Sequence, residues 1–545
     1  MKNIILHAII LFLVVSVHIT ASAQYEWSWA ITEGGPYTEY ITSITYGPGG
    51  NIYATGVFDD TLVFFGETII SRGDHDVFVA SFTSEGNLNW VRCGGSELED
   101  SPRDIQTDNQ YVYVTGGFQN EAVFDNKTIV SGGLEDVFVL KYDLAGTLQW
   151  AINGGSPHRD YGHAIATDNN GNIYLTGSIR NPATFGNYFV PHMGYTDIFI
   201  AKYDGDGTCQ WAQGAGGQIW DYASSIVVKD NHVFICGGFN DVGHFDTISV
   251  TSIEYNDIFI AHYLTDGSVI EVATAGGSGN DVAECMALDN DMNLYIGGAF
   301  LLDLTIGNNS FNSVSQTMDM FLTKFEPGNG FIWAKHFGAG GIDEIVDIYC
   351  DGNEHFVFAG HFENTIDFGS LELTSEGNND AGFVKCTFGG EIECVCQIGG
   401  SGGVTVADFV GDGSGHYYAG GSFLDELRIG DFTFIPAGVH DLFLANLAES
   451  TGIDDEMEMG PGFRVYPNPA VDVITIRYRI PDAGYRIMSI VDISGRVVWS
   501  SSGEELTPGK YETGIDVSDV PAGIYFLRLQ IGNETVVRKL IKLEL

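Results

Sequence analysis

A unit of about sixty-one residues recurs seven times along this chain, and such a repeat constrains the fold more than any other feature of the sequence. Each copy contains a segment that begins with aspartate and continues with apolar residues, as in Asp197-Ile198-Phe199. This aspartate recurs every 60 to 62 residues, as Asp76, Asp136, Asp197, Asp257, Asp319, Asp380 and Asp441. A glycine pair recurs in step, and its first member is Gly34, Gly94, Gly154, Gly216, Gly276, Gly340 or Gly399. Most of the chain is therefore predicted to consist of seven equivalent units.

Each unit is predicted to form four short antiparallel strands. The first follows the glycine pair, the second is rich in tyrosine, the third begins with the repeated aspartate, and the fourth ends in tryptophan in most units. Turn sequences such as Asp168-Asn169-Asn170-Gly171 connect the strands. The third strand is apolar at successive positions, so both of its faces must be buried. Sheets stacked face to face around an axis bury both faces, and the predicted fold is an all-β, seven-bladed β-propeller.

The order of the segments predicts how the ring of units closes. Trp27-Ser28-Trp29 precede the first glycine pair, in the place that the fourth strand has elsewhere. The last unit has Asp455 where its own tryptophan would stand. We therefore expect the strand around residues 27–31 to complete the unit that contains residues 441–447, which leaves no open edge.

The repeat resembles the bacterial β-propeller repeat family called SBBP. The residues that carry the resemblance are the glycine pair, Asn172-Ile173-Tyr174-Leu175-Thr176-Gly177 and Asp197-Ile198-Phe199. The resemblance covers about residues 25–447 and implies a propeller domain, predicted at 24–448, without a fixed activity.

The N-terminal segment that precedes the propeller predicts export. Lys2, an apolar run to Val17 and Ala21-Ser22-Ala23 are typical of a signal peptide, predicted at residues 1–23. No later segment has the ~18 apolar residues that a membrane-spanning helix needs. The net charge of −48 excludes a nucleic-acid binder and a protein that binds anionic membranes, since both partners would be repelled.

A second domain follows an acidic linker at residues 449–462. Residues 463–545 contain ten basic and ten acidic residues, so nearly all of the negative charge lies in the propeller. Seven strand-like segments in about eighty residues predict a small Ig-like β-sandwich.

This domain resembles the C-terminal sorting domain of type IX (Por) secretion cargo in the Bacteroidetes. The motif residues are Tyr466, Pro467, Asn468, Pro469, Gly495, Arg496, Gly523, Tyr525 and Lys539. The resemblance implies passage through the outer membrane by that machinery, removal of the domain, and either release or attachment to surface lipopolysaccharide. An ordinary Ig-like domain is the alternative interpretation.

No motif predicts a catalytic residue, a cofactor or a zinc site. Gly399-Gly400-Ser401-Gly402-Gly403 matches GxSxG but falls on a repeated glycine pair. The segments 168–172 and 289–293 suggest calcium loops, but they lack the downstream glutamate of an EF-hand and are better explained as hairpin turns. Cys386 and Cys394 lie on neighbouring strands, as a cross-strand disulfide or as two unpaired residues.

One acidic residue follows the glycine pair in six of the seven units. If these side chains face the axis at a mouth of the channel, their repulsion requires a bound cation such as Ca²⁺, a cationic partner group or raised pKa values. The alternative is that each hydrogen-bonds backbone within its own unit. The six residues are Glu39, Asp100, Asp160, Asp221, Asp281 and Asp343.

Three functions fit these observations. The leading hypothesis is a secreted or surface-displayed binding protein for a glycan or protein ligand. The second is a polysaccharide lyase or glycosidase, which requires paired carboxylates or a His-Tyr set in one or two units, and the repeats show no such exception. The third is a structural component of the cell envelope.

Overall fold

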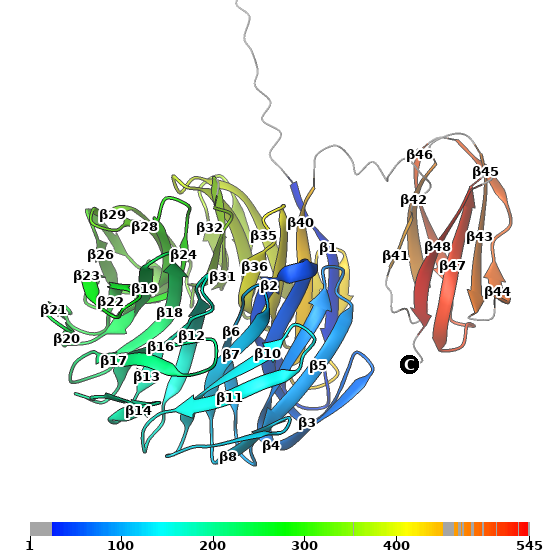
Figure 1. The fold of residues 1–545 in the computed structure, drawn as a ribbon. Helices are drawn as coiled ribbons and strands as arrows, with labels where there is room; N and C mark the ends of the chain where they lie inside the picture. Colours follow the sequence, from blue (N-terminus) through cyan, green and yellow to red (C-terminus); the bar gives the residue numbers. More distant parts are fainter. Residues whose placement is uncertain are drawn as a thin grey trace, which may run out of the picture.

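The computed structural model describes residues 24–352, 354–450, 463–466, 470, 473–480, 484–492, 495–507, 509–531 and 534–542. The predicted signal peptide and most of the predicted acidic linker lie outside these residues. The described part is all-β apart from two short 3₁₀ turns, at Pro48–Gly50 and Val314–Gln316. Figure 1 shows the sheets of residues 24–450 arranged as in a propeller.

Seven antiparallel sheets in the described residues share a core of four strands, as the repeat predicts. In the first three sheets these are β2 (Glu39–Gly47), β3 (Asn51–Phe64), β4 (Glu67–Thr83) and β5 (Leu88–Gly95); β6 (Ser101–Thr107), β7 (Tyr111–Phe118), β10 (Asp136–Asp143) and β11 (Leu148–Gly154); and β12 (Tyr161–Thr167), β13 (Ile173–Ile179), β16 (Asp197–Tyr203) and β17 (Cys209–Ala215). In the next two they are β18 (Tyr222–Lys229), β19 (His232–Phe239), β22 (Asp257–Leu264) and β23 (Val269–Ala275); and β24 (Asp281–Leu288), β25 (Leu294–Leu301), β28 (Met318–Glu326) and β29 (Gly330–Phe337). The last two contain β30 (Glu344–Cys350), β31 (His355–Phe362), β34 (Asp380–Thr387) and β35 (Ile392–Gly400); and β36 (Val404–Gly411), β37 (His416–Phe423), β40 (Asp441–Ser450) and β1 (Gln24–Glu33).

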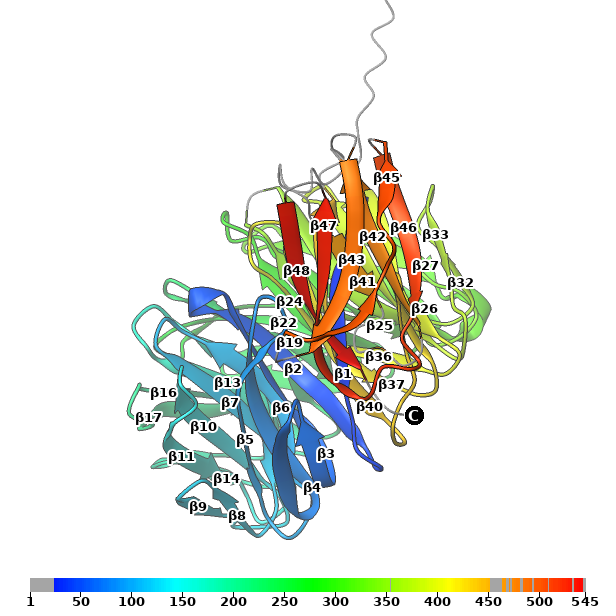
Figure 2. The ribbon, with the colours of Figure 1, turned by 90° about the vertical axis from the view of Figure 1, so that its right-hand side faces the viewer.

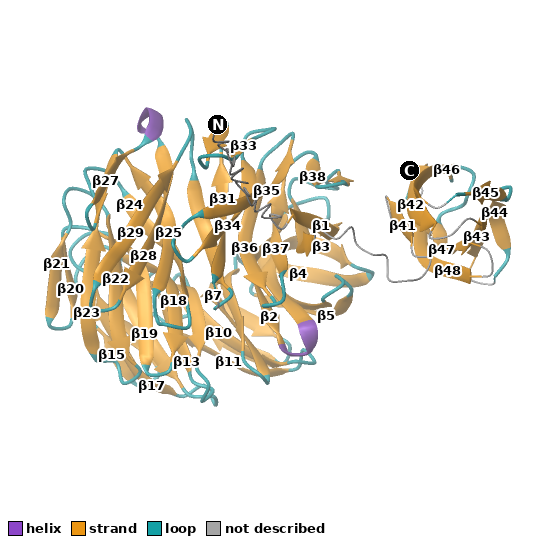
Figure 3. Ribbon diagram, turned by 90° about the horizontal axis from the view of Figure 1, so that it is seen from above, coloured by secondary structure: helices purple, strands orange, loops and turns teal. Residues whose placement is uncertain are grey.

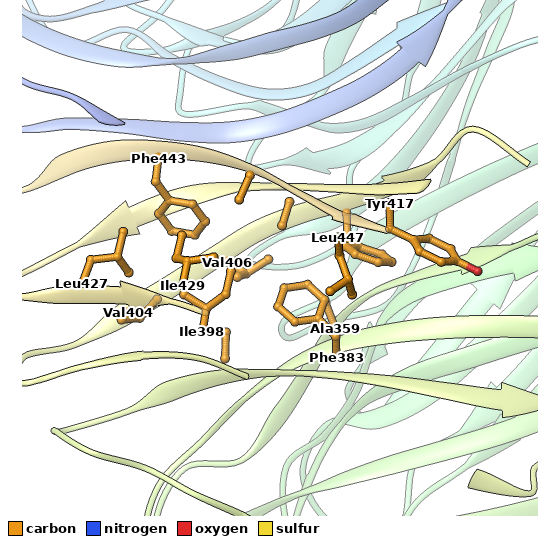
Figure 4. Packing of buried hydrophobic residues seen from close by; sticks show 14 of the residues in the cluster. Ala359, Phe383, Ile398, Val404, Val406, Tyr417, Leu427, Ile429, Phe443 and Leu447 are labelled. Atoms are coloured by element: carbon orange, nitrogen blue, oxygen red, sulfur yellow. The ribbon is translucent and has the colours of Figure 1, made fainter. Parts of the chain in front are cut away.

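The first strands of the seven sheets lie innermost, and each contacts the next. The order is β2, β6, β12, β18, β24, β30 and β36, and β36 in turn contacts β2. Figure 1 shows the sheets following one another around this inner layer, and Figure 3 shows that strands and loops make up nearly all of the described fold. Buried residues of neighbouring sheets pack face to face, as Phe383 and Ile398 do against Phe443 and Leu447 (Figure 4). This packing explains why the third strand of each unit is apolar on both faces.

The N-terminal strand β1 completes the seventh sheet, and the pairing predicted for residues 27–31 is present. Trp27 lies opposite Leu447 and Ile31 opposite Leu444 (Figure 1, blue beside gold). The indole N–H of Trp29 also donates to the backbone oxygen of Ser84 in the first sheet, at 3.0 Å. Trp90 forms the same bond to the sheet after its own, at 3.0 Å to Leu144. The N-terminal strand thus has the same role as the fourth strand of the other units.

A short hairpin between the second and third strands is a feature that the four-strand prediction missed. Its strands are three or four residues long, too short to show a sequence period. The hairpins are β8 (Glu121–Phe124) with β9 (Lys127–Val130), β14 (Ala183–Phe185) with β15 (Tyr188–Val190), β20 (Val242–Phe245) with β21 (Ile248–Thr251), β26 (Asp303–Ile306) with β27 (Asn309–Asn312), β32 (Thr365–Asp367) with β33 (Glu372–Thr374), and β38 (Leu427–Ile429) with β39 (Phe432–Phe434). Because β8 pairs with β5 and β38 pairs with β35, these hairpins also tie neighbouring sheets together.

The repeated glycine is required by the repeated aspartate. A Cβ atom on Gly276 would lie 2.1 Å from Cγ of Asp257, so no other residue fits there without rearrangement. Asp257 itself accepts a hydrogen bond from the backbone N–H of Ile253 at 3.0 Å, which fixes the turn before its strand. In the sixth unit the structurally equivalent glycine is Gly338, which packs on Asp319, and not the predicted Gly340.

The described residues between 463 and 542 form a β-sandwich of two sheets (Figure 2, orange and red). Its buried core includes Ile474, Ile476, Met488, Leu527 and Leu529. One sheet contains β41 (Phe463–Tyr466), β42 (Val473–Ile480) and β46 (Gly509–Asp516), and the other β43 (Gly484–Asp492), β44 (Val497–Ser500), β45 (Glu504–Leu506), β47 (Gly523–Ile531) and β48 (Glu534–Lys542).

Candidate functional site

The six candidate carboxylates are buried at the beginning of the inner strands: two are the first residue of their strand, and four directly precede it. Glu39, Asp100, Asp160, Asp221, Asp281 and Asp343 are each 0% exposed. Asp221 accepts backbone N–H groups of Gly217 at 2.6 Å and Asn240 at 2.9 Å, and Asp343 those of Ala339 at 2.6 Å and Glu363 at 3.0 Å. The sequence left two arrangements open, with the side chains facing the axis or hydrogen-bonded to backbone. These contacts correspond to the second arrangement. None of the six carboxylates lines the channel cavities described below.

Each of these residues lies close to the repeated aspartate of the preceding unit. The position that a Cβ on Gly216 would take is 2.8 Å from Oδ1 of Asp197 and 2.9 Å from Oδ2 of Asp221. Burial raises the pKa of Asp221 to about 7, and the charge of Asp197 adds to the shift. Burial likewise raises the pKa of Asp281 from 3.8 to about 8, with a contribution from Asp257. Pairs of buried carboxyls therefore bind protons more tightly in the folded chain than in the unfolded chain.

These pairs predict a propeller that is more stable in mild acid than in mild base. A raised pKa adds stability that is complete below the unfolded pKa of 3.8 and is lost as the pH rises through about 8. Replacing Asp281 by Asn removes the charge and keeps an acceptor for the N–H of Leu301. We expect Asp281→Asn to raise the unfolding midpoint at pH 8 by several degrees, ~3 °C or more, and to change it little at pH 5.

The matched control is Asp206→Asn, at an exposed turn. Its midpoint is expected to follow that of the unchanged chain at both pH values. A lower midpoint for Asp281→Asn at pH 8 would show that the ionised carboxylate stabilises the fold. Added calcium tests the other explanation, since a cation held by the pair would raise the midpoint of the unchanged chain and not that of Asp281→Asn.

The segments that suggested calcium loops are hairpin turns. Oδ1 of Asp168 accepts the backbone N–H groups of Asn170 at 2.8 Å and Asn172 at 3.0 Å, and Oδ2 accepts from the Asn172 side chain at 2.7 Å. Asp289 makes the same bonds in its own turn. Within the described residues, no group of three or more His, Cys, Asp or Glu side chains is arranged to hold a metal ion. The eight cysteines are free, and Lys385, not Cys386, lies opposite Cys394.

A β-bulge interrupts every inner strand. Each inner strand is the edge of its sheet, so some of its backbone N–H groups face away from that sheet, and one of them belongs to the residue two positions after the bulged residue. In four units, a side chain of the neighbouring unit accepts this N–H. Oδ2 of Asp408 accepts from Ile44 at 2.8 Å, and Oδ2 of Asp104 from Ile165 at 2.7 Å. The bonds to Asp347 and Ser43 are 3.0 and 3.2 Å. These side chains lock adjacent inner strands together around the channel.

The same four side chains border a central cavity of about 310 Å³, lined by all seven inner strands. Asp347 and Asp408 share a hydrogen bond, and burial together with their mutual repulsion raises the pKa of Asp408 well above its ordinary value. Two adjacent units thus contain the paired carboxyls that the enzyme hypothesis requires. The comparison of the repeat motifs did not show this pair. The pair can be found by aligning the seven units at the fourth position after the candidate carboxylate. The residues at this position are Ser43, Asp104, Ala164, Ser225, Cys285, Asp347 and Asp408.

His163 also borders this cavity, between the rings of Tyr161 and Tyr222 at 6.1 and 6.3 Å. Its Nδ1 lies 2.9 Å from the carbonyl oxygen of Ala223, and its Nε2 lies 3.3 Å from the hydroxyl of Ser178. Burial, assisted by Arg103, lowers the pKa of His163 to about 4, so the ring is neutral at pH 7. Because both ring nitrogens have partners within the protein, His163 connects two units and is poorly placed to act as a base.

One end of the channel opens into a depression of about 910 Å³. It is lined by the turns between the first and second strands, and it shares Gln106, Ile226 and Val227 with the central cavity. The Lys141 ammonium lies 3.6 Å from the ring centroid of Tyr111 and donates to the carbonyl of Gly205 at 2.7 Å. Exposed amide side chains surround this pair, namely Asn109, Gln110, Asn169 and Asn170. The depression thus combines an aromatic surface with hydrogen-bonding groups, as ligand sites do.

Two family models match the chain. The model described as "Secretion system C-terminal sorting domain" matches residues 464–543, and the SBBP model, described as "Beta-propeller repeat", matches residues 152–181. The chain carries a C-terminal sorting domain and a propeller repeat. The sorting domain directs export to the cell surface or extracellular space by the type IX machinery. The described residues contain no helix long and apolar enough to cross a membrane.

Several motif residues of the sorting domain form defined turns. Gly495 has a φ of 86°, and its N–H donates to the carbonyl of Asp492 at 2.9 Å, which closes the turn between β43 and β44. The N–H of Arg496 bonds the Asp492 side chain at 3.0 Å, and the Tyr525 hydroxyl donates to the carbonyl of Pro521 at 2.8 Å. Gly523 begins β47, Tyr466 ends β41 and Lys539 lies in β48, whereas Pro467, Asn468 and Pro469 lie outside the described residues.

Curated relatives match only part of the chain. An uncharacterized WD repeat-containing protein L264 of Acanthamoeba polyphaga mimivirus is 27% identical over 185 residues, 29% of this chain and 13% of the relative. The regulatory protein FlaEY of Caulobacter vibrioides is 27% identical over 152 residues, 26% of this chain and 16% of the relative. The chain thus covers less than a fifth of either protein.

Two solved structures show distant likenesses. A glycoside hydrolase family 43 arabinoxylan arabinofuranohydrolase from Bacillus subtilis has a TM-score of 0.26 and 11% identity, covering 81% of this chain and 94% of that chain. Latent PorU from Porphyromonas gingivalis has a TM-score of 0.14 and 11% identity, covering 70% and 32%.

Proposed function

We propose that this chain is a secreted or cell-surface binding protein that holds a glycan at the amide-rich end of its propeller channel. The observation that carries the proposal is the depression of about 910 Å³, where turns of several units bring unlike polar side chains together. Asn and Gln amides both donate and accept hydrogen bonds, which suits vicinal sugar hydroxyls. The ring of Tyr111 supplies an apolar surface for a sugar face. A protein ligand is the alternative within the same role.

The proposed route of export has three parts. Residues 1–23 act as a signal peptide for transfer to the periplasm, and the sorting domain then directs passage through the outer membrane. Cleavage in the acidic linker at 449–462 removes the sorting domain, because this segment combines glycine, proline and carboxylates with little apolar content to bury. The product is then released or attached to surface lipopolysaccharide.

Screening the full-length protein on an array of bacterial, plant and animal polysaccharides tests the proposed function. The unchanged chain is expected to retain at least one glycan. Asn109→Ala/Gln110→Ala is expected to weaken that binding about thirtyfold, because each of the two lost bonds to a ligand costs about 1 kcal/mol. Asn126→Ala, at the exposed turn of the β8–β9 hairpin, is the matched control and is expected to bind normally. Glycan binding that is unaffected by the double change would contradict the assignment of this site.

The Asp347–Asp408 pair favours one second candidate, an enzyme that acts on polysaccharide. A shared proton between two carboxyls is the arrangement that separates an acid from a base. The array distinguishes the two functions, since an enzyme releases shortened sugars. In that case Asp408→Asn would abolish release, whereas a binding protein would retain the same glycan with or without this change.

A further inference from the structure

Two exposed aromatic rings and an arginine lie together at the opposite end of the propeller from the depression. Tyr195 is 54% exposed and Trp220 is 42% exposed, and their ring centroids are 4.4 Å apart. The Arg180 guanidinium carbon lies 5.2 Å from each ring centroid. Trp220 precedes β18, whereas Lys229 at the end of β18 lines the depression. The length of that strand therefore separates the two surfaces.

The backbone holds these side chains in place. The N–H groups of Tyr195 and Thr196 donate to the carbonyl of Ile219 at 3.2 and 3.0 Å, and the N–H of Asp221 donates to Thr196 at 2.9 Å. The N–H of Arg180 bonds Oδ1 of Asp160 at 3.0 Å. A surface built on loops that are tied in this way loses little conformational entropy when a ligand binds.

In the described part of the ring, this combination occurs at one junction between units. The residues equivalent to Trp220 are Thr38, Glu99, Arg159, Asn280, Ile342 and Gly403. Tyr255 is the counterpart of Tyr195 at the next junction and is 56% exposed, but Asn280 stands there in place of tryptophan. The repeat explains buried aspartates and glycines, and it gives no reason for an exposed aromatic pair at a single junction.

The charge and the free hydrogen-bond donors of the site indicate the chemical class of its ligand. Among the described residues, the Arg180 guanidinium forms no ion pair or side-chain hydrogen bond, and neither the Trp220 indole N–H nor the Tyr195 hydroxyl has a hydrogen-bond partner. The free donors of the Arg180 guanidinium favour a single anionic group at this junction. The net charge of −48 repels polyanions, so we expect a ligand whose carboxylates are sparse. The planar guanidinium matches a carboxylate in two hydrogen bonds, while exposed aromatic rings pack against the C–H face of a sugar.

We propose that Arg180, Tyr195 and Trp220 form a binding site for a carboxylated sugar residue of an extracellular polysaccharide. A uronate ring stacks on Trp220 and Tyr195, and its carboxylate pairs with Arg180. The proposal deepens the proposed function, on which it rests, by naming an acidic glycan and a second contact surface on the same chain.

Titration calorimetry of the full-length protein with a neutral oligosaccharide that carries one galacturonate residue, and with the methyl ester of the same oligosaccharide, tests this site. We expect the free acid to bind more tightly than the ester, and the difference to shrink as salt is added. Trp220→Ala and Tyr195→Ala are expected to weaken binding of both forms about tenfold or more. Arg180→Gln is expected to weaken only the acid and to abolish the preference for it.

The control is Tyr255→Ala, which removes an equally exposed tyrosine at the next junction and is expected to leave both affinities unchanged. No binding of the free acid, equal affinity for acid and ester, or unchanged binding by Trp220→Ala would overturn the proposal. The double change at Asn109 and Gln110 separates the two sites. If that variant loses glycan binding while Trp220→Ala keeps it, the proposed function stands and this second site does not.

Discussion

Deleting residues 24–33 will lower the unfolding midpoint of the propeller by about 5 °C or more. The deletion removes β1, exposes the edge of β40 and leaves the bond from Trp29 to Ser84 unmade. The deletion also removes Tyr25, Trp27 and Trp29, which pack against buried residues of the sheets. Loss of these three large side chains costs on the order of 5 kcal/mol. Differential scanning calorimetry of chains that begin at residue 24 and at residue 34 measures the difference.

Two controls show whether closure of the ring causes the effect. Glu26→Ala changes an exposed side chain of β1 and is expected to leave the midpoint unchanged. A synthetic peptide of residues 24–33, added to the shortened chain, is expected to restore part of the lost stability, because the edge of β40 remains available for pairing. Equal midpoints for the full and shortened chains would refute the closing role of β1.

Deleting residues 463–545 will trap the protein in the periplasm of a host that has the type IX machinery. The deletion removes the whole sorting domain and leaves the propeller strands intact, so the product is expected to fold and to accumulate behind the outer membrane. Cell fractionation and immunoblotting measure its location. The Asn109→Ala/Gln110→Ala chain, which retains the sorting domain, is the control and is expected to reach the surface normally.

Normal surface display of the shortened chain would contradict the sorting role. Loss of the protein from every fraction would instead indicate degradation, and the calorimetric midpoint of the purified shortened chain then shows whether the propeller folds by itself. A midpoint equal to that of the full chain, combined with absence from the surface, supports the sorting role.

The architecture could be predicted from the repeat because each repeated residue marks the same place in a four-stranded unit. Seven aspartates at nearly constant spacing required seven equivalent strands, and Trp27-Ser28-Trp29 matched the fourth strand of a unit, so the pairing of β1 with β40 followed from the order of the segments. The outer hairpins did not follow, since strands of three or four residues have no readable period. The glycine pair of the sixth unit predicts Gly340, whereas the structure requires Gly338, because an alanine separates Gly338 from the pair.

The candidate site was less predictable because spacing does not fix the direction of a side chain. The repeated position of Asp100 and its equivalents was evident, but only the structure shows that these carboxylates bond loop backbone away from the channel. The residue four positions later borders the central cavity in all seven units, beyond a bulge that shifts the register of the strand. At that position the units differ, and it is these differences that distinguish Asp347 and Asp408 from a uniform structural repeat.

Hydrogen exchange of the full-length protein, with and without the glycan that it retains, tests the central claim most directly. The account predicts slower exchange of amide hydrogens in residues 107–111 and 168–171, the turns that line the depression, and no such slowing in Asn109→Ala/Gln110→Ala. Protection confined to the outer hairpins, such as β20–β21, with unchanged exchange in those turns would contradict it.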